Sequence, residues 1–82
     1  MRGEKGRRVR EWGEYVAYGD TMIKVGISYR IFDENGNLTS TGIIWEAENV
    51  GLGEPAEEAV ERARRRAREK IKRLLERHHG EG

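Results

Sequence analysis

Hydrophobic and polar residues alternate strictly in the middle of the chain. In the segment TMIKVGISYRIF every second residue is apolar or aromatic: Ile23, Val25, Ile27, Tyr29 and Ile31. A period of two is typical of a β-strand that buries one face. The pattern therefore predicts a strand over residues 21–32 whose odd-numbered side chains form the core.

The sequence DENGN directly after this strand predicts a β-hairpin. A three-residue loop with Gly36 in the left-handed conformation would pair Asp33 with Asn37 and lead into a third strand over residues 37–47. Continued along that strand, this loop places Ile43 and Trp45 on the core face. A two-residue Asn-Gly turn would instead set Tyr29 against Gly42. We favour the three-residue loop because it makes the buried face more apolar.

A first strand is predicted over residues 8–18, joined to the central strand by a tight turn at Gly19 and Asp20. This register places Trp12 on the core face, but it places Glu14 there as well. An acidic residue is unfavourable in a core, so we expect Gly13 to mark a β-bulge that redirects the strand.

The face of the sheet away from the core has two unusual features in these registers. Gly13, Gly26 and Gly42 lie across its middle, which predicts a sharp bend of the sheet or, alternatively, the close approach of another backbone or a ligand. The face is also apolar, with Val9 beside five residues that we predict to mediate self-association: Tyr15, Met22, Phe32, Leu38 and Ile44. We expect a homodimer through this face or through an edge strand.

A long helix is predicted over residues 55–78. Pro55 suits its first position, and the glutamates that follow complement the positive end of the helix dipole. Apolar residues then recur at steps of three or four and form one stripe: Ala56, Val60, Ala63, Ala67, Ile71, Leu74 and His78. The small alanines would let this helix lie close against the sheet.

These elements predict an α+β fold: a three-stranded antiparallel meander followed by one C-terminal helix packed on one sheet face. The chain of 82 residues suits one domain, here expected over residues 8–79. A flexible basic tail is expected over residues 1–7, and a disordered end over residues 80–82.

Charge is distributed unevenly along the chain. The net charge of +1 combines +4 over residues 1–10, −9 over residues 11–61 and +6 over residues 62–82. A basic face is therefore possible despite the neutral total. There is no cysteine, and no apolar run approaches the length of a membrane span. We expect a soluble protein without a membrane partner, and a cytoplasmic one if it is natural or recombinantly expressed.

Residues for catalysis or metal binding are sparse. Ser28 and Ser40 fall on predicted strands, and the only histidines, His78 and His79, lie near the C-terminus without the i, i+4 spacing of a helical metal site. GLGEP before the helix resembles a phosphate-binding loop, but the glutamates around it would repel a phosphate. We expect no enzymatic activity, no cofactor, no metal and no small-molecule substrate.

The segment RARRRAREK, residues 62–70, has two interpretations. As a solvated helix face, its cations would pair with acids one turn earlier, as in Glu58–Arg62, Glu61–Arg65 and Glu69–Arg73. As a nucleic-acid interface, the helix and the basic tail would contact phosphates through seven arginines: Arg7, Arg8, Arg10, Arg62, Arg65, Arg66 and Arg73. We expect a structural scaffold first and a nucleic-acid-binding module as the alternative.

The order of three strands and a helix resembles two families of nucleic-acid-binding domains. Residues 21–77 are similar in topology to the last three strands and final helix of double-stranded-RNA-binding domains, but GEPAEEAVE is acidic where that family has lysines. Plant ethylene-response-type DNA-binding domains share the order and read DNA with the sheet. Lys24 and Arg30 would lie on that face here, together with Glu11 and Glu46.

The chain also resembles idealised de novo designed α+β proteins with a curved sheet. One strand alternates cleanly, a short hairpin loop follows it, and proline opens a helix with acids first and bases last. Such agreement between local and global signals is typical of designed sequences. This resemblance implies a scaffold without catalytic activity.

Overall fold

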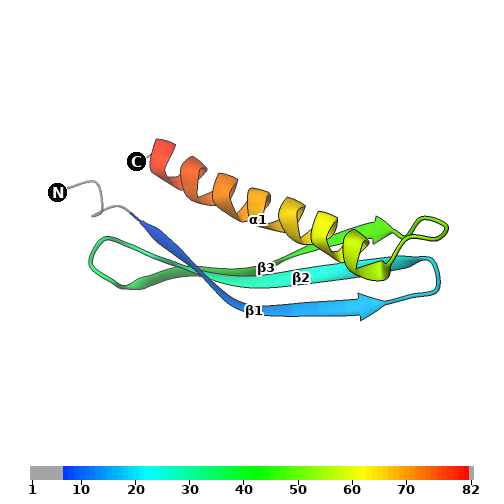
Figure 1. The fold of residues 1–82 in the computed structure, drawn as a ribbon. Helices are drawn as coiled ribbons and strands as arrows, with labels where there is room; N and C mark the ends of the chain where they lie inside the picture. The colour runs from blue at the N-terminus through cyan, green and yellow to red at the C-terminus, as the bar shows by residue number, and fades with distance from the viewer. Residues whose placement is uncertain (1–6, 82) are drawn as a thin grey trace.

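The computed structural model describes the backbone of residues 7–81 and the side chains of residues 7–74. The chain forms three antiparallel strands in sequence order and then a helix: β1 (Arg8–Tyr18), β2 (Met22–Phe32), β3 (Leu38–Asn49) and α1 (Ala56–Glu81). The helix lies along one face of the sheet, mainly over β2 and β3 (Figure 1). The predicted α+β meander with one C-terminal helix is confirmed. The predicted tail, except Arg7, lies outside the described residues.

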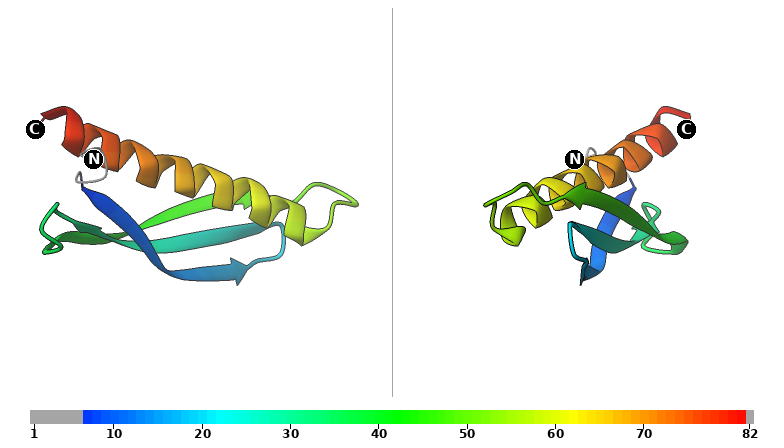
Figure 2. Two further views of the ribbon diagram at one scale, coloured as in Figure 1. Left: turned by 60° about the vertical axis from the view of Figure 1, so that its left-hand side comes forward. Right: turned by 90° about the vertical axis from the view of Figure 1, so that its right-hand side faces the viewer.

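The two faces of the sheet are covered unequally. Figure 2 shows α1 crossing one face of the twisted sheet, whereas no other element of the described chain lies against the opposite face. We call the face under α1 the helix face and the opposite one the outer face. Two residues that pair across antiparallel strands have their side chains on the same face of the sheet, and successive residues of one strand alternate between the faces. The observed register therefore assigns each strand residue to the helix face or to the outer face.

The core lies between the central strand and the helix. Its fully buried side chains come from alternate positions of β2 and from one stripe of α1: Ile23, Val25, Ile27, Ile31, Ala59, Val60, Ala63, Ala67 and Ile71. The period-two pattern is confirmed by the buried residues of β2, and the helical stripe is confirmed at Val60, Ala63, Ala67 and Ile71. The side chain of His78, the predicted last member of the stripe, lies outside the described residues. Three of the five buried helix residues are alanines, so the backbone of α1 can approach the sheet closely.

The β2–β3 hairpin has the predicted three-residue loop. The Asp33 amide donates to the carbonyl of Asn37 at 2.9 Å, and Gly36 is left-handed with φ of 88°. The Asp33 carboxylate also accepts the amide hydrogens of Asn35 and Asn37, each at 2.9 Å, which lowers the pKa of Asp33. The loop is therefore fixed by one aspartate and one glycine.

The register that we derived from this loop holds for its first two pairs, Asp33–Asn37 and Phe32–Leu38, and is wrong beyond them. Phe32 pairs with Leu38, but Ile31 pairs with Ser40, so Thr39 is one extra residue in β3. The Thr39 hydroxyl donates to the carbonyl of Ile31 at 3.1 Å and holds this bulge in place. A one-residue shift exchanges the two faces of a strand. The remainder of β3 therefore has the register that the two-residue Asn-Gly turn would have given, with Tyr29 opposite Gly42.

The bulge in β3 reassigns its central residues. Ile43 and Trp45 lie on the outer face and are 40% and 50% exposed, rather than in the core. Ile44 packs against the core instead, and Glu46 lies on the helix face opposite Val25.

The β1–β2 connection is also shifted, while the predicted bulge is confirmed. Gly19 donates its amide to the carbonyl of Met22 at 2.8 Å, so the tight turn is centred on Asp20 and Thr21. The pairs Glu11–Tyr29 and Gly13–Ser28 leave Trp12 as the extra residue of β1. Glu11 consequently faces the helix, and Trp12 is 57% exposed rather than in the core.

The predicted row of three glycines does not form. Gly26 pairs with Trp45, and Gly42 pairs with Tyr29 on the other face. A Cβ atom at Gly26 would lie 2.7 Å from three atoms of the Trp45 ring, and one at Gly42 would lie 2.5 Å from the Tyr29 hydroxyl. Both glycines therefore make room for an aromatic ring of the neighbouring strand, an arrangement that stabilises glycine in sheets. The close approach that we considered is made by the chain itself.

We predict that Gly26→Val lowers the free energy of unfolding by about 1–3 kcal/mol, because the new side chain displaces the Trp45 ring. The same substitution in a Trp45→Ala background should be neutral or stabilising, since valine favours strands and nothing then collides with it. Urea unfolding of the four proteins of this cycle measures both effects. An equal loss in both backgrounds would show that the ring is not the reason for the glycine.

Candidate functional site

Four glutamates of the edge strands point toward α1. They occupy the helix face on either side of the buried β2 residues: Glu11 and Glu14 in β1, Glu46 and Glu48 in β3. The cations of residues 62–70 pair with all four. Since the cations lie at i, i+4 spacing along two edges of the helix, each edge faces one edge strand.

Arg64 and Arg68 bind the β1 edge. Arg64 is bidentate on Glu14, with Nε 3.0 Å from Oε1 and Nη2 2.6 Å from Oε2, and it also pairs with Glu61. Arg68 Nε lies 3.0 Å from Glu11. The hydrogen bond from Arg64 lowers the pKa of Glu14 and raises that of Arg64 itself.

Arg66 and Lys70 bind the β3 edge. Arg66 contacts Glu46 at 3.1 Å, Glu48 at 2.6 Å and the carbonyl of Ala47 at 2.7 Å. Lys70 pairs with the other oxygen of Glu46. The Glu46 side chain is only 10% exposed, and its pKa is lowered chiefly by the hydrogen bond from Lys70.

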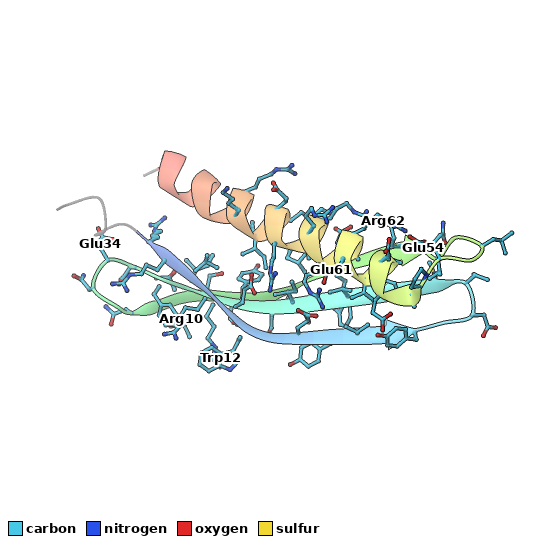
Figure 3. All side chains as sticks on the ribbon, viewed as in Figure 1. Arg10, Trp12, Glu34, Glu54, Glu61 and Arg62 are labelled. Atoms are coloured by element: carbon cyan, nitrogen blue, oxygen red, sulfur yellow. The ribbon has the colours of Figure 1, made fainter. Side chains whose placement is uncertain are left out.

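Arg62 connects β3 to the loop before the helix. Its guanidinium contacts Glu48 at 2.9 Å and pairs with Glu54, whose carboxylate also accepts the amide of Gly51 at 2.8 Å (Figure 3). The hydrogen bonds from Arg62 and Gly51 lower the pKa of Glu54 to about 2. Glu54 therefore holds the GLGEP loop against the helix, and its carboxylate occupies the place that a phosphate would need.

The structure separates the arginines of the predicted nucleic-acid interface. Arg62 and Arg66 are bound to sheet carboxylates, whereas Arg65 and Arg73 are exposed on the helix. Arg8 and Arg10 lie on the outer face, on the side opposite α1. The three predicted i, i+4 pairs are also wrong, because none of them is among the ion pairs of residues 7–74. Arg8 and Arg10 therefore do not form one basic surface with the arginines of the helix.

The outer face instead carries a basic surface of its own. Its cations come from β1 and β2: Arg8, Arg10, Lys24 and Arg30. No strand residue on this face, within the fully described residues 8–49, is acidic. The expectation that Glu11 and Glu46 share the face with Lys24 and Arg30 is wrong, because the two bulges turn both glutamates toward the helix.

Exposed aromatic rings lie between these cations. Trp12, Tyr15 and Trp45 are each at least half exposed, and Figure 3 shows Trp12 on the side of the sheet away from the helix. The Arg30 guanidinium lies 3.8 Å from the centre of the Trp12 ring, a cation–π contact. The sequence had placed both tryptophans in the core, so this combination of rings and cations was missed.

The residues predicted for self-association divide between the two faces. Tyr15, Met22 and Leu38 are exposed on the outer face, and Phe32 is half-buried there. Ile44 lies on the helix face against the core, so its assignment to the outer face is corrected. Beside Phe32 the surface has a shallow hollow of about 380 Å³, lined by Arg8, Val9, Arg10, Phe32, Asp33 and Gly36.

Comparisons with protein-family models, with curated proteins and with solved structures found no match to this chain. Within the described residues no three potential metal ligands cluster together. None of the helical sequence described is long and apolar enough to span a membrane.

We predict that stability falls in acid. Glu14, Glu46, Glu48 and Glu54 all have pKa values below their ordinary value of 4.5, and that of Glu54 is about 2. Such carboxylates stabilise the fold well above pH 4.5, and this stabilisation is lost as the pH falls through the folded-state pKa. The melting temperature should be constant near neutral pH and decrease from about pH 4.5 to 2. Glu54→Gln should reduce this dependence, whereas an unchanged slope would contradict the assignment.

We predict that Glu46→Gln lowers the free energy of unfolding by about 2 kcal/mol. The substitution weakens two charge-assisted hydrogen bonds to a carboxylate that is 10% exposed. Glu34→Gln is the matched control, since Glu34 is exposed in the β2–β3 loop and should change stability by less than about 0.5 kcal/mol. Equal effects of the two substitutions in urea unfolding would argue against the ion-pair network.

Proposed function

We propose that this protein is a non-catalytic nucleic-acid-binding module that uses the outer face of its sheet. The separation of charge between the two faces is the observation that supports this function. The acids of the strands lie under the helix and are paired there, while four cations and three exposed rings occupy the opposite face. Clustered Lys and Arg residues attract the phosphate backbone, and exposed rings add contacts to bases.

The proposed interface differs from the one that the sequence suggests. The helix segment RARRRAREK is the most basic stretch of the chain, but five of its six cations are bound to carboxylates of the protein. A phosphate would have to displace those carboxylates. On the outer face the cations have no carboxylate partner on the strands, and Arg30 contacts a ring instead.

Self-association through the same face is the second candidate. It is favoured by the number of large apolar side chains exposed there: Trp12, Tyr15, Met22, Leu38, Ile43 and Trp45. Two copies packed face to face would, however, bring four cations of one copy toward four of the other. Like charges in an interface oppose association. A polyanion complements the same surface, and for this reason we favour nucleic acid.

We predict salt-dependent binding to nucleic acid. Fluorescence anisotropy with labelled oligonucleotides should show affinity that falls with salt, with a slope of log K against log salt of about −3 for four phosphate contacts. Arg10→Ala should weaken binding and reduce this slope by about one, because Arg10 lies on the outer face. Arg65→Ala is the matched control: it removes an exposed arginine of the helix and should have no effect.

Two results would overturn this function. If no oligonucleotide binds at low salt, the outer face is not a nucleic-acid interface. If the mass in solution corresponds to a stable dimer and Trp45→Ala converts it to a monomer, the second candidate is correct and the face is occupied by another copy.

A further inference from the structure

We infer that Trp45, lying flat on Gly26, is a stacking platform for an unpaired base, so that the ligand of the outer face is single-stranded. This inference rests on the proposed function and specifies its ligand. It concerns one place on the face, where the row Tyr15, Gly26 and Trp45 crosses the three strands.

The geometry at Gly26 shows how the indole lies. A Cβ atom built there would be 2.7 Å from each of three atoms at the far end of the six-membered ring, Cε3, Cζ3 and Cη2. Equal distances to three ring atoms mean that the ring plane faces the glycine rather than standing on edge. Gly26 is itself buried, whereas Trp45 remains 50% exposed. One face of the indole is therefore supported by the backbone, and the other is open to solvent.

The neighbours of this ring extend the platform and supply charge. Tyr15 is tilted by 33° to Trp45, with the ring centres 6.5 Å apart. Lys24 lies two residues before Gly26 in β2, on the same face and about 7 Å along the strand. Toward the other end of the sheet, Trp12 lies under the guanidinium of Arg30. Flat rings thus alternate with cations along the face.

Exposed flat rings favour an unpaired strand over a duplex. In a duplex each base is stacked on its neighbours, so its faces are not available to an aromatic side chain. In a single strand the bases can separate, stack on rings and leave the phosphates to nearby cations, and this mode tolerates any sequence. A duplex would use the four cations of this surface and leave the platform unused.

The inference can be tested by comparing a single strand and a duplex of roughly 12 nucleotides in anisotropy titrations. The single strand should bind at least about tenfold more tightly at equal salt. Trp45→Leu should weaken single-strand binding by about 5- to 100-fold and leave duplex binding nearly unchanged, while Trp45→Phe retains most of the affinity. Ile43→Ala is the matched control, since it removes an exposed apolar side chain without a ring and should change affinity less than about twofold.

A second readout does not depend on removing the platform. In a Trp12→Phe protein, Trp45 is the only tryptophan, and a base stacked on it should quench its fluorescence in proportion to binding. Salt-dependent binding that is equal for both ligands, with no quenching and no effect of Trp45→Leu, would overturn the inference and leave the proposed function intact. Binding of neither ligand at low salt would overturn both.

Discussion

Two extra residues, Trp12 in β1 and Thr39 in β3, determine which side chains each face of this sheet presents. Each bulge adds one residue to an edge strand, and a shift of one residue exchanges the faces of everything beyond it. Together they turn Glu11, Glu46 and Glu48 under the helix. They also turn Trp12, Ile43 and Trp45 outward.

The glutamates of the edge strands lie on the helix face, and this explains why α1 combines buried alanines with many arginines. Alanines at 59, 63 and 67 are fully buried, so α1 lies close to β2 and its neighbouring side chains reach over the edge strands. A glutamate beside this interface loses water and requires a cation, which arginine supplies from a long stem with several donors. The pairs are therefore a consequence of close packing. Individually exposed pairs contribute little, but this network also neutralises Glu46, which is nearly buried.

Much of the fold could be predicted from the sequence, because the apolar residues of β2 recur at every second position and those of α1 at steps of three or four. Each pattern identifies its own strand or helix without information from the rest of the chain. The hairpin loop was predictable for the same reason: Asp33 and Gly36 act locally. The bulge at Gly13 was also predicted, but the reason for it was wrong: Glu14 stays on the helix face, where Arg64 binds it. The resemblance to designed proteins stays a prediction, as does the absence of enzymatic activity.

The outer face could not be predicted, because its residues depend on the Thr39 bulge, which has no strong local signal. Counting apolar residues favoured the wrong register, since Ile43 and Trp45 resemble core residues. The charged residues of β3 and α1 gave a better indication of which β3 residues face the helix. Glu46 and Glu48 need cations, and Arg62, Arg66 and Lys70 recur at the spacing that faces a neighbouring strand. Charge complementarity between distant segments would have identified the correct face.

The same separation of charge connects stability with the proposed function. Each glutamate paired under the helix removes a negative charge from the surroundings of the outer face and also neutralises a helix cation. Five of the six cations of the segment RARRRAREK are therefore bound within the protein, whereas the cations of β1 and β2 have no acidic strand residue beside them on the outer face. Aromatic rings can remain exposed beside them because Gly26 supports the indole of Trp45 from below. A chain with one net positive charge can thus present a basic, aromatic surface, provided that its acids are held on the opposite face of a sheet only one layer thick.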